Sequence, residues 1–150
     1  AIVKGSPSKP EGDITLPISV PKQGKVRIDP GGRPSKTLYK MVENFKQYSL
    51  LEVYPLTGRT HQIRVHLQAI GHALAIDPLY SGVSRIGIER FKRIQRNQDE
   101  KKKSLMARLS LHAYELEFHS PEISTRYKFR ADIPGDMMAL LKALRKWDTV

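Results

Sequence analysis

Residues 56–66 read LTGRTHQIRVH, and they carry the densest functional signal in the chain. The glycine here favours a turn, and Thr60 is placed to cap a helix that begins directly after it. Apolar residues then recur with helical spacing, at Ile63, Leu67 and Ile70. This spacing predicts a helix over about residues 61–70, and Gly71 is placed to end it.

The start of this predicted helix combines groups that suit an anionic ligand. Its polar side chains are Arg59, His61, Gln62, Arg64 and His66. Together with the free backbone N–H groups of a helix N-terminus, they suit a phosphate, a carboxylate or a base turned out of RNA. Arg64 lies between two apolar residues, so we expect it to be half-buried and to need an anionic partner. No acidic residue lies close in sequence to supply one, and a solvated basic surface is an equally good interpretation of the pattern.

Strand-like segments lie on both sides of the central helix. They cover residues 1–4, 14–18, 25–28, 36–43, 48–56, 109–118 and 124–131. We expect antiparallel hairpins from 36–43 with 48–56 and from 109–118 with 124–131. A closing helix is predicted from an apolar face at Met137, Leu140, Leu141, Leu144 and Trp147. The sum is one α+β domain over residues 1–150, with a mainly antiparallel mixed sheet, a central helix and a C-terminal helix.

Composition points to a polyanionic partner. The chain has 26 Lys and Arg against 15 Asp and Glu, a formal net charge of +11, and nucleic acid is the commonest partner for such a balance. Residues 85–103 form a basic segment within the domain that is expected to be a solvated face and, as a hypothesis, contacts the RNA backbone through Arg90, Lys92 and Arg93. No apolar run approaches the ~20 residues of a membrane span, so we expect a cytoplasmic protein with no membrane partner.

Metal and cofactor chemistry finds little support in the sequence. There are no cysteines, and the five histidines show no helical pair at the spacing of a metal site: His61, His66, His72, His112 and His119. No serine lies in a nucleophile elbow, and the glycines do not form a phosphate loop. We therefore expect no metal ion.

Residues 56–66 closely resemble the signature of the RluA-type family of RNA pseudouridine synthases. The resemblance extends to Gly71-His72, Asp77 and Tyr80, and it covers the whole chain except residues 85–103. Ala73 and Ile76 depart from it, since the family commonly has proline and glycine there. The resemblance implies cofactor-free isomerisation of uridine to pseudouridine in ribosomal or transfer RNA, with the target base flipped into a pocket.

The resemblance also assigns roles to individual residues. The family uses an aspartate to initiate glycosidic cleavage and an arginine that pairs with it, and that role falls on Arg64. Leu111 is the candidate apolar residue of the pocket. The predicted RNA-binding residues are Arg59, Thr60, His61, Gln62, His66, Arg90, Lys92 and Arg93.

The aspartate of the family is not found in this sequence. It belongs to a His-Arg-Leu-Asp stretch upstream of the segment that resembles Ala1–Gly5, and Asp29 lacks the residues that should follow it. The sequence therefore reads as the C-terminal portion of a synthase catalytic domain, inactive alone and able to self-associate through an exposed sheet edge. An inactive RNA-binding module of the same fold is the alternative, and a basic domain of a ribonucleoprotein is a weaker one.

Overall fold

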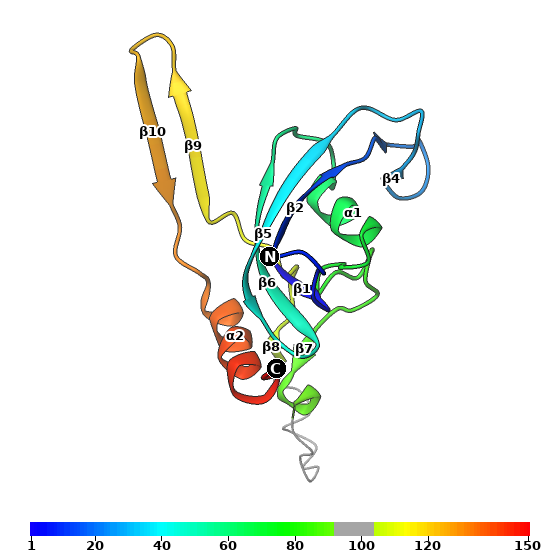
Figure 1. Cartoon of the computed structure of the whole chain (residues 1–150), viewed down its shortest axis with the longest axis vertical. Coiled ribbons are helices and arrows are strands. Elements are labelled where there is room, and N and C mark those ends of the chain that lie inside the picture. Colours follow the sequence, from blue (N-terminus) through cyan, green and yellow to red (C-terminus); the bar gives the residue numbers. More distant parts are fainter. Residues whose placement is uncertain (92–103) are drawn as a thin grey trace.

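A computed structural model describes residues 1–91 and 104–150, and a four-stranded antiparallel sheet forms its body (Figure 1). The strand order is β1-β6-β5-β2. These strands are β1 (Ile2–Lys4), β2 (Glu11–Thr15), β5 (Lys36–Asn44) and β6 (Tyr48–Pro55). The hairpin expected from residues 36–56 is confirmed, since β5 and β6 pair in antiparallel register. The α+β architecture expected from the sequence is confirmed as well.

Helix α1 (Gln62–Ala69) packs on one face of this sheet (Figure 1). Leu67 is fully buried, and it belongs to an apolar cluster with Val3, Ile14, Leu51 and Leu74. The prediction that Thr60 caps this helix is wrong. His61 occupies the N-cap position in the left-handed region, at φ 54°, and makes no capping hydrogen bond from its side chain.

The end of α1 agrees with the sequence. Gly71 has a φ of 85°, a conformation that glycine adopts without a steric penalty. Its N–H donates to the carbonyl of Gln68 at 2.9 Å. The chain then turns back toward β1, where Leu74 bridges to Val3.

Short elements complete the body around α1. They are β3 (Ile18–Ser19), β4 (Arg27–Ile28), β7 (Ile86–Gly87), the 3-10 turn η1 (Ile88–Arg90) and β8 (Ser104–Met106). The strand expected over residues 14–18 is divided in two, because Pro17 has no N–H to continue the pairing of β2. The basic segment of residues 85–103 begins with β7 and η1, and its residues 92–103 lie outside the described residues.

The C-terminal third forms a projecting hairpin and a closing helix. Strands β9 (Glu115–Ser120) and β10 (Thr125–Arg130) pair with each other and extend away from the body, and α2 (Gly135–Trp147) returns to it (Figure 1). The predicted apolar face of α2 is buried at Met137, Leu140, Leu141 and Leu144. The strand expected from residue 109 begins only at Glu115.

Ser110, in the segment before β9, is held by the body. Ser110 is fully buried, its hydroxyl donates to the carbonyl of Ile2 at 2.7 Å, and it accepts the N–H of Ile76 at 3.1 Å. Backbone hydrogen bonds join the same residues. This anchor fixes the neighbouring Leu111 beside the start of α1.

Candidate functional site

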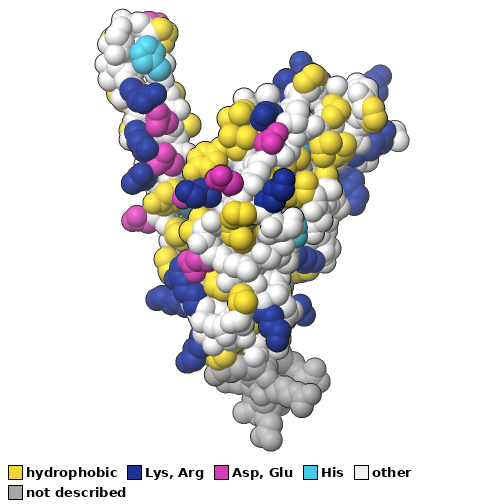
Figure 2. Space-filling view, viewed as in Figure 1, with side chains coloured by type: hydrophobic (Ala, Val, Ile, Leu, Met, Phe, Trp, Pro, Cys, Tyr) yellow, Lys and Arg dark blue, Asp and Glu magenta, His cyan; other side chains and the backbone are white. Residues whose placement is uncertain are grey.

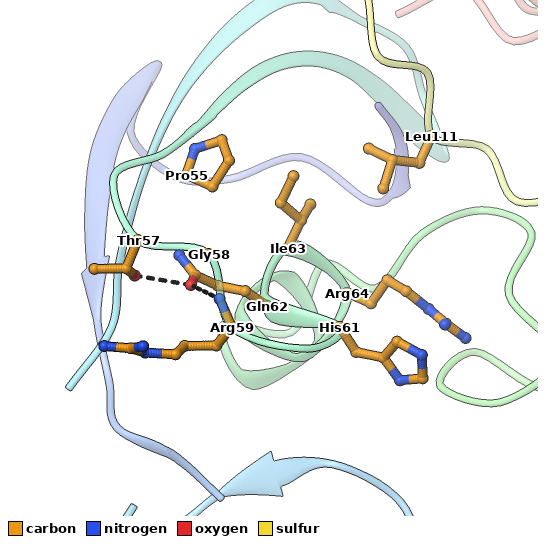
Figure 3. A pocket seen from close by; sticks show the side chains of 9 residues that line it. All are labelled: Pro55, Thr57, Gly58, Arg59, His61, Gln62, Ile63, Arg64 and Leu111. Carbon is orange, nitrogen blue, oxygen red and sulfur yellow. Dashed lines mark hydrogen bonds between the residues drawn. The ribbon is translucent and has the colours of Figure 1, made fainter. Parts of the chain in front are cut away.

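A pocket of about 200 Å³ lies at the N-terminal end of α1. Its lining residues are Pro55, Thr57, Gly58, Arg59, His61, Gln62, Ile63, Arg64 and Leu111. Figure 3 shows Arg59 on one side of the pocket, with Arg64 and His61 together on the other. Leu111 reaches the pocket from the segment before β9, so two parts of the chain that are distant in sequence form one site.

Gln62 holds the turn before the helix against the sheet. Its side-chain oxygen accepts hydrogen bonds from the Thr57 hydroxyl at 2.8 Å and from the Arg59 N–H at 3.0 Å (Figure 3). Its amide nitrogen donates to the Lys36 carbonyl and to the Thr37 hydroxyl, each at 2.9 Å. Every hydrogen-bonding position of this side chain is therefore used within the fold.

His66 joins the same network one turn further along α1. Its Nε2 contacts the carbonyl of Leu16 at 2.9 Å, so this nitrogen carries the proton and donates. Its Nδ1 then accepts from the Thr37 hydroxyl, also at 2.9 Å. The ring is completely buried, and burial lowers the pKa of His66 although the hydrogen bond to Leu16 acts in the opposite direction.

The predicted binding of RNA by Gln62 and His66 stays a prediction, and in the structure both side chains are buried. Gln62 is 4% exposed and His66 is 0% exposed, and their polar atoms already have partners. Polar side chains ordinarily favour the outward side of such a helix. The sheet instead presents buried polar groups to α1, above all the hydroxyl of Thr37, and these draw the two side chains inward.

Arg64 has the anionic partner that its surroundings require. Its Nε donates to Oδ2 of Asp77 at 2.7 Å and its Nη2 donates to Oδ1 at 2.8 Å. No acidic residue lies close to Arg64 in sequence, but the chain returns after α1 and brings Asp77 back to it. The Asp77 side chain is fully buried, and the Arg64 side chain is 14% exposed.

The electrostatics of this pair follow from burial and hydrogen bonding. Burial alone would raise the pKa of Asp77, but hydrogen bonds from Arg64 and from the N–H groups of Tyr80 and Leu79 outweigh it and keep this pKa below its usual value. The pKa of Arg64 is raised, chiefly by the hydrogen bond to Asp77. Both groups are therefore charged at neutral pH.

His61 reaches the pair through Tyr80. The Tyr80 hydroxyl donates to the carbonyl of Val26 at 3.1 Å, so Nδ1 of His61, 2.9 Å from that hydroxyl, is the donor to it. Burial lowers the pKa of His61, and the positive charge of Arg64 lowers it further. At neutral pH the ring is uncharged, and its Nε2 is an acceptor at the pocket.

The other predicted RNA-binding residues are not all gathered at this pocket. Arg59 lines it, with Nε donating to the Pro34 carbonyl at 3.3 Å, and Thr60 is exposed beside it. Arg90 contacts Gln47, in the turn between β5 and β6, whereas the pocket lies beyond the other end of β6. Lys92 and Arg93 lie outside the described residues.

No helix within residues 1–91 and 104–150 is long and apolar enough to cross a membrane.

Solved structures share this fold. The human RNA pseudouridylate synthase domain containing 4 superposes with a TM-score of 0.68 and 22% identity, over 97% of this chain and 60% of that one. The human RNA pseudouridylate synthase domain containing 1 gives a TM-score of 0.61 and 19% identity, over 100% and 65%. The fold is therefore that of a pseudouridine synthase domain.

Sequence relatives narrow the class to a family. Residues 1–69 match the family model described as RNA pseudouridylate synthase. The ribosomal large subunit pseudouridine synthase D of Neisseria meningitidis is 42% identical over 77% of this chain, and that of Nitrosomonas europaea is 35% identical over 97%. The chain belongs to the RluA-type family of RNA pseudouridine synthases. It spans 29% and 40% of the length of these two relatives.

Proposed function

We propose that this chain supplies the arginine-bearing part of an RNA pseudouridine synthase site, which isomerises uridine to pseudouridine in ribosomal or transfer RNA. The observation that carries the proposal is the meeting of Arg64 and Leu111 at one pocket. The family resemblance assigns these residues to the aspartate-pairing and base-lining roles. The site would act in the cytoplasm, where these RNAs are processed.

The pocket offers a flipped nucleotide both apolar contacts and polar or charged groups. Ile63 and Leu111 present apolar side chains suited to the face of a uracil ring. Arg64 and the neutral His61 supply hydrogen-bonding atoms on one side, and Arg59 supplies positive charge on the other. The net charge of +11 favours the approach of RNA as a whole.

The same lining explains why the chain alone is predicted to be inactive. None of the residues that line the pocket carries a carboxylate, and Asp77 is already paired with Arg64. The aspartate that attacks in this family must therefore enter from a segment outside these residues. Arg64 keeps N–H groups that Asp77 does not use, and these can pair with such an aspartate.

Activity is tested by restoring that aspartate. We would fuse the segment of the Neisseria meningitidis relative that precedes the matched region to this chain, and measure tritium release from RNA labelled at C5 of uridine. We expect release from the fusion protein, none from the chain alone, and none from the fusion carrying Arg64→Met, which should still bind the RNA. Turnover by the Arg64→Met fusion near that of the unsubstituted fusion would refute the role of Arg64.

An RNA-binding module without catalysis is the second candidate function. Its support is the absence of a carboxylate among the pocket-lining residues. The two candidates differ in one result, because an inactive module would bind uridine-containing RNA at the pocket and the fusion protein would release no tritium. The predicted backbone contact through Arg90 is separate from the pocket, and replacing Arg90 should reduce the salt dependence of RNA affinity.

Self-association through an exposed sheet edge stays a prediction, and we propose the β9–β10 hairpin as its location. Leu116, Phe118 and Phe129 are 61%, 46% and 55% exposed on one face of the hairpin. The three Lys and Arg of residues 115–130 are balanced by three Glu, whereas the whole chain carries +11. Two copies could therefore meet at this hairpin without the repulsion expected elsewhere, which sedimentation at increasing concentration would reveal.

A further inference from the structure

The contact between Arg64 and Asp77 uses one particular edge of the guanidinium. Asp77 accepts from Nε and from one N–H of Nη2. Both N–H groups of Nη1, and the second one of Nη2, have no acceptor within the described residues. Since Arg64 lines the pocket, these are the groups that it can offer to a ligand.

Asp77 is held by its own loop, independently of Arg64. Its Oδ1 accepts the backbone N–H of Leu79 at 3.0 Å and that of Tyr80 at 3.1 Å. Its own carbonyl accepts the N–H of Ser81 at 2.9 Å. The carboxylate therefore has a fixed direction in a buried site, and the longer, more flexible arginine side chain must orient itself to it.

Tyr80 restrains the guanidinium from a second direction. The centre of its ring lies 4.8 Å from Cζ of Arg64, a distance at which a cation is attracted to an aromatic face. Its hydroxyl is held by the Val26 carbonyl and by His61. The loop from Asp77 to Tyr80 thus contacts Arg64 both at its edge and at its face.

We infer that Asp77 is a positioning residue, which orients Arg64 so that its Nη1 end is presented to the uridine site. The inference rests on the proposed function, because it assigns Asp77 to the same pocket. It gives Asp77 a role distinct from that of the attacking aspartate. The attacking group would approach the free end of Arg64, while Asp77 holds the opposite edge.

The test uses the whole chain and uridine 5′-monophosphate as the probe. Binding is followed by nuclear magnetic resonance at the methyl groups of Ile63 and Leu111, and the arginine Nε–H signals report the salt bridge. Asp77→Asn is close in shape but removes the charge that holds Arg64. We expect it to abolish the slowly exchanging Nε–H signal of Arg64 and to weaken nucleotide binding about tenfold.

Glu43→Gln is the matched control. Arg145 binds Glu43 through the same two nitrogens, at 2.8 and 2.5 Å, on a surface remote from the pocket. Both substitutions raise the net charge by the same amount, so attraction of the anionic probe by charge alone would strengthen binding equally in the two variants. We expect Glu43→Gln to leave the affinity for the nucleotide within twofold of that of the parent chain.

The outcomes separate a failure of the positioning role of Asp77 from a failure of the proposed function. Binding by Asp77→Asn that equals or exceeds that of the parent would overturn the positioning role and leave the proposed function standing. No methyl shifts in the parent chain would overturn the proposed function and the role of Asp77 with it. If Asp77→Asn does not fold, the test is made on the parent chain alone. There the nucleotide should shift the Nη1 signals of Arg64 and leave its Nε signal in place. A shift of Nε instead would contradict the inference.

Discussion

Two regions of this molecule use the same kinds of side chain in opposite ways. Around α1, charged and polar groups such as Arg64, Asp77 and Gln62 are buried or nearly so, and each meets specific partners. On the β9–β10 hairpin, Glu115 forms ion pairs with Lys128 and Arg130 at 2.9 and 2.7 Å, yet these groups are open to water. Figure 2 shows basic and acidic side chains alternating along the projecting arm.

This difference shows that the contribution of an ion pair to stability is not set by its geometry alone. A short contact in water replaces good hydration with a similar interaction, and its net effect on stability is small. A buried group has no water to return to, so removing its partner leaves the full cost of desolvation. The region around α1 should therefore be sensitive to single substitutions, and the hairpin should tolerate them.

The largest effect is expected from Asp77→Ala. It leaves the half-buried guanidinium of Arg64 without its partner and frees the N–H groups of Leu79 and Tyr80. We expect the free energy of unfolding to fall by about 3–5 kcal/mol, measured by urea denaturation. A loss below about 1 kcal/mol would show that the two regions do not differ as described.

Gln62→Ala should come next. The substitution removes four hydrogen bonds and leaves the Arg59 N–H and the Lys36 carbonyl without this partner. We expect a loss of about 2–3 kcal/mol in the same denaturation experiment. Gln68→Ala is the control on the same helix, because Gln68 is exposed and makes a single hydrogen bond, to Tyr80. It should cost less than about 1 kcal/mol.

The stability of the chain should also depend on pH through the buried network, with a smaller effect than that of Asp77→Ala or Gln62→Ala. The pKa of His66 is lowered in the folded protein, chiefly by burial, so the unfolded chain binds a proton more readily. Stability is therefore full above the ordinary histidine pKa of about 6.5 and declines as pH falls below it. His61 contributes in the same direction. Unfolding curves between pH 8 and about pH 5 should show the decline, and His66→Gln should reduce it.

The smallest effect is expected on the hairpin. Arg130→Ala removes a 2.7 Å contact with Glu115, but both side chains are exposed and Lys128 remains beside the carboxylate. The melting temperature of the chain should not change measurably. Phe118→Ser on the apolar face should likewise leave the melting temperature of the body unchanged while it weakens any self-association. A marked drop in melting temperature from either variant would mean that the hairpin supports the body.

The sequence predicted those parts of the fold that depend on neighbours along the chain. The hairpin of β5 and β6 follows from alternation and a short turn. The C-terminal end of α1 follows from Gly71, and the presence of α2 follows from the apolar spacing of Met137 to Leu144. Arg64 and Leu111 were singled out through the family resemblance, and the structure places both at the pocket. Their roles in the reaction stay predictions.

Tertiary structure alone decided which polar groups face inward and what they contact. Nothing local indicates that Thr37, on a strand, draws Gln62 and His66 into the interior, or that Asp77 returns to Arg64 after an intervening turn. A side chain's local pattern reports its preference for water, but burial depends on what the rest of the fold presents to it. For this chain, residue spacing determined where helices and strands form. Contacts between distant segments determined which polar residues of 56–66 are buried in the fold and which line the pocket.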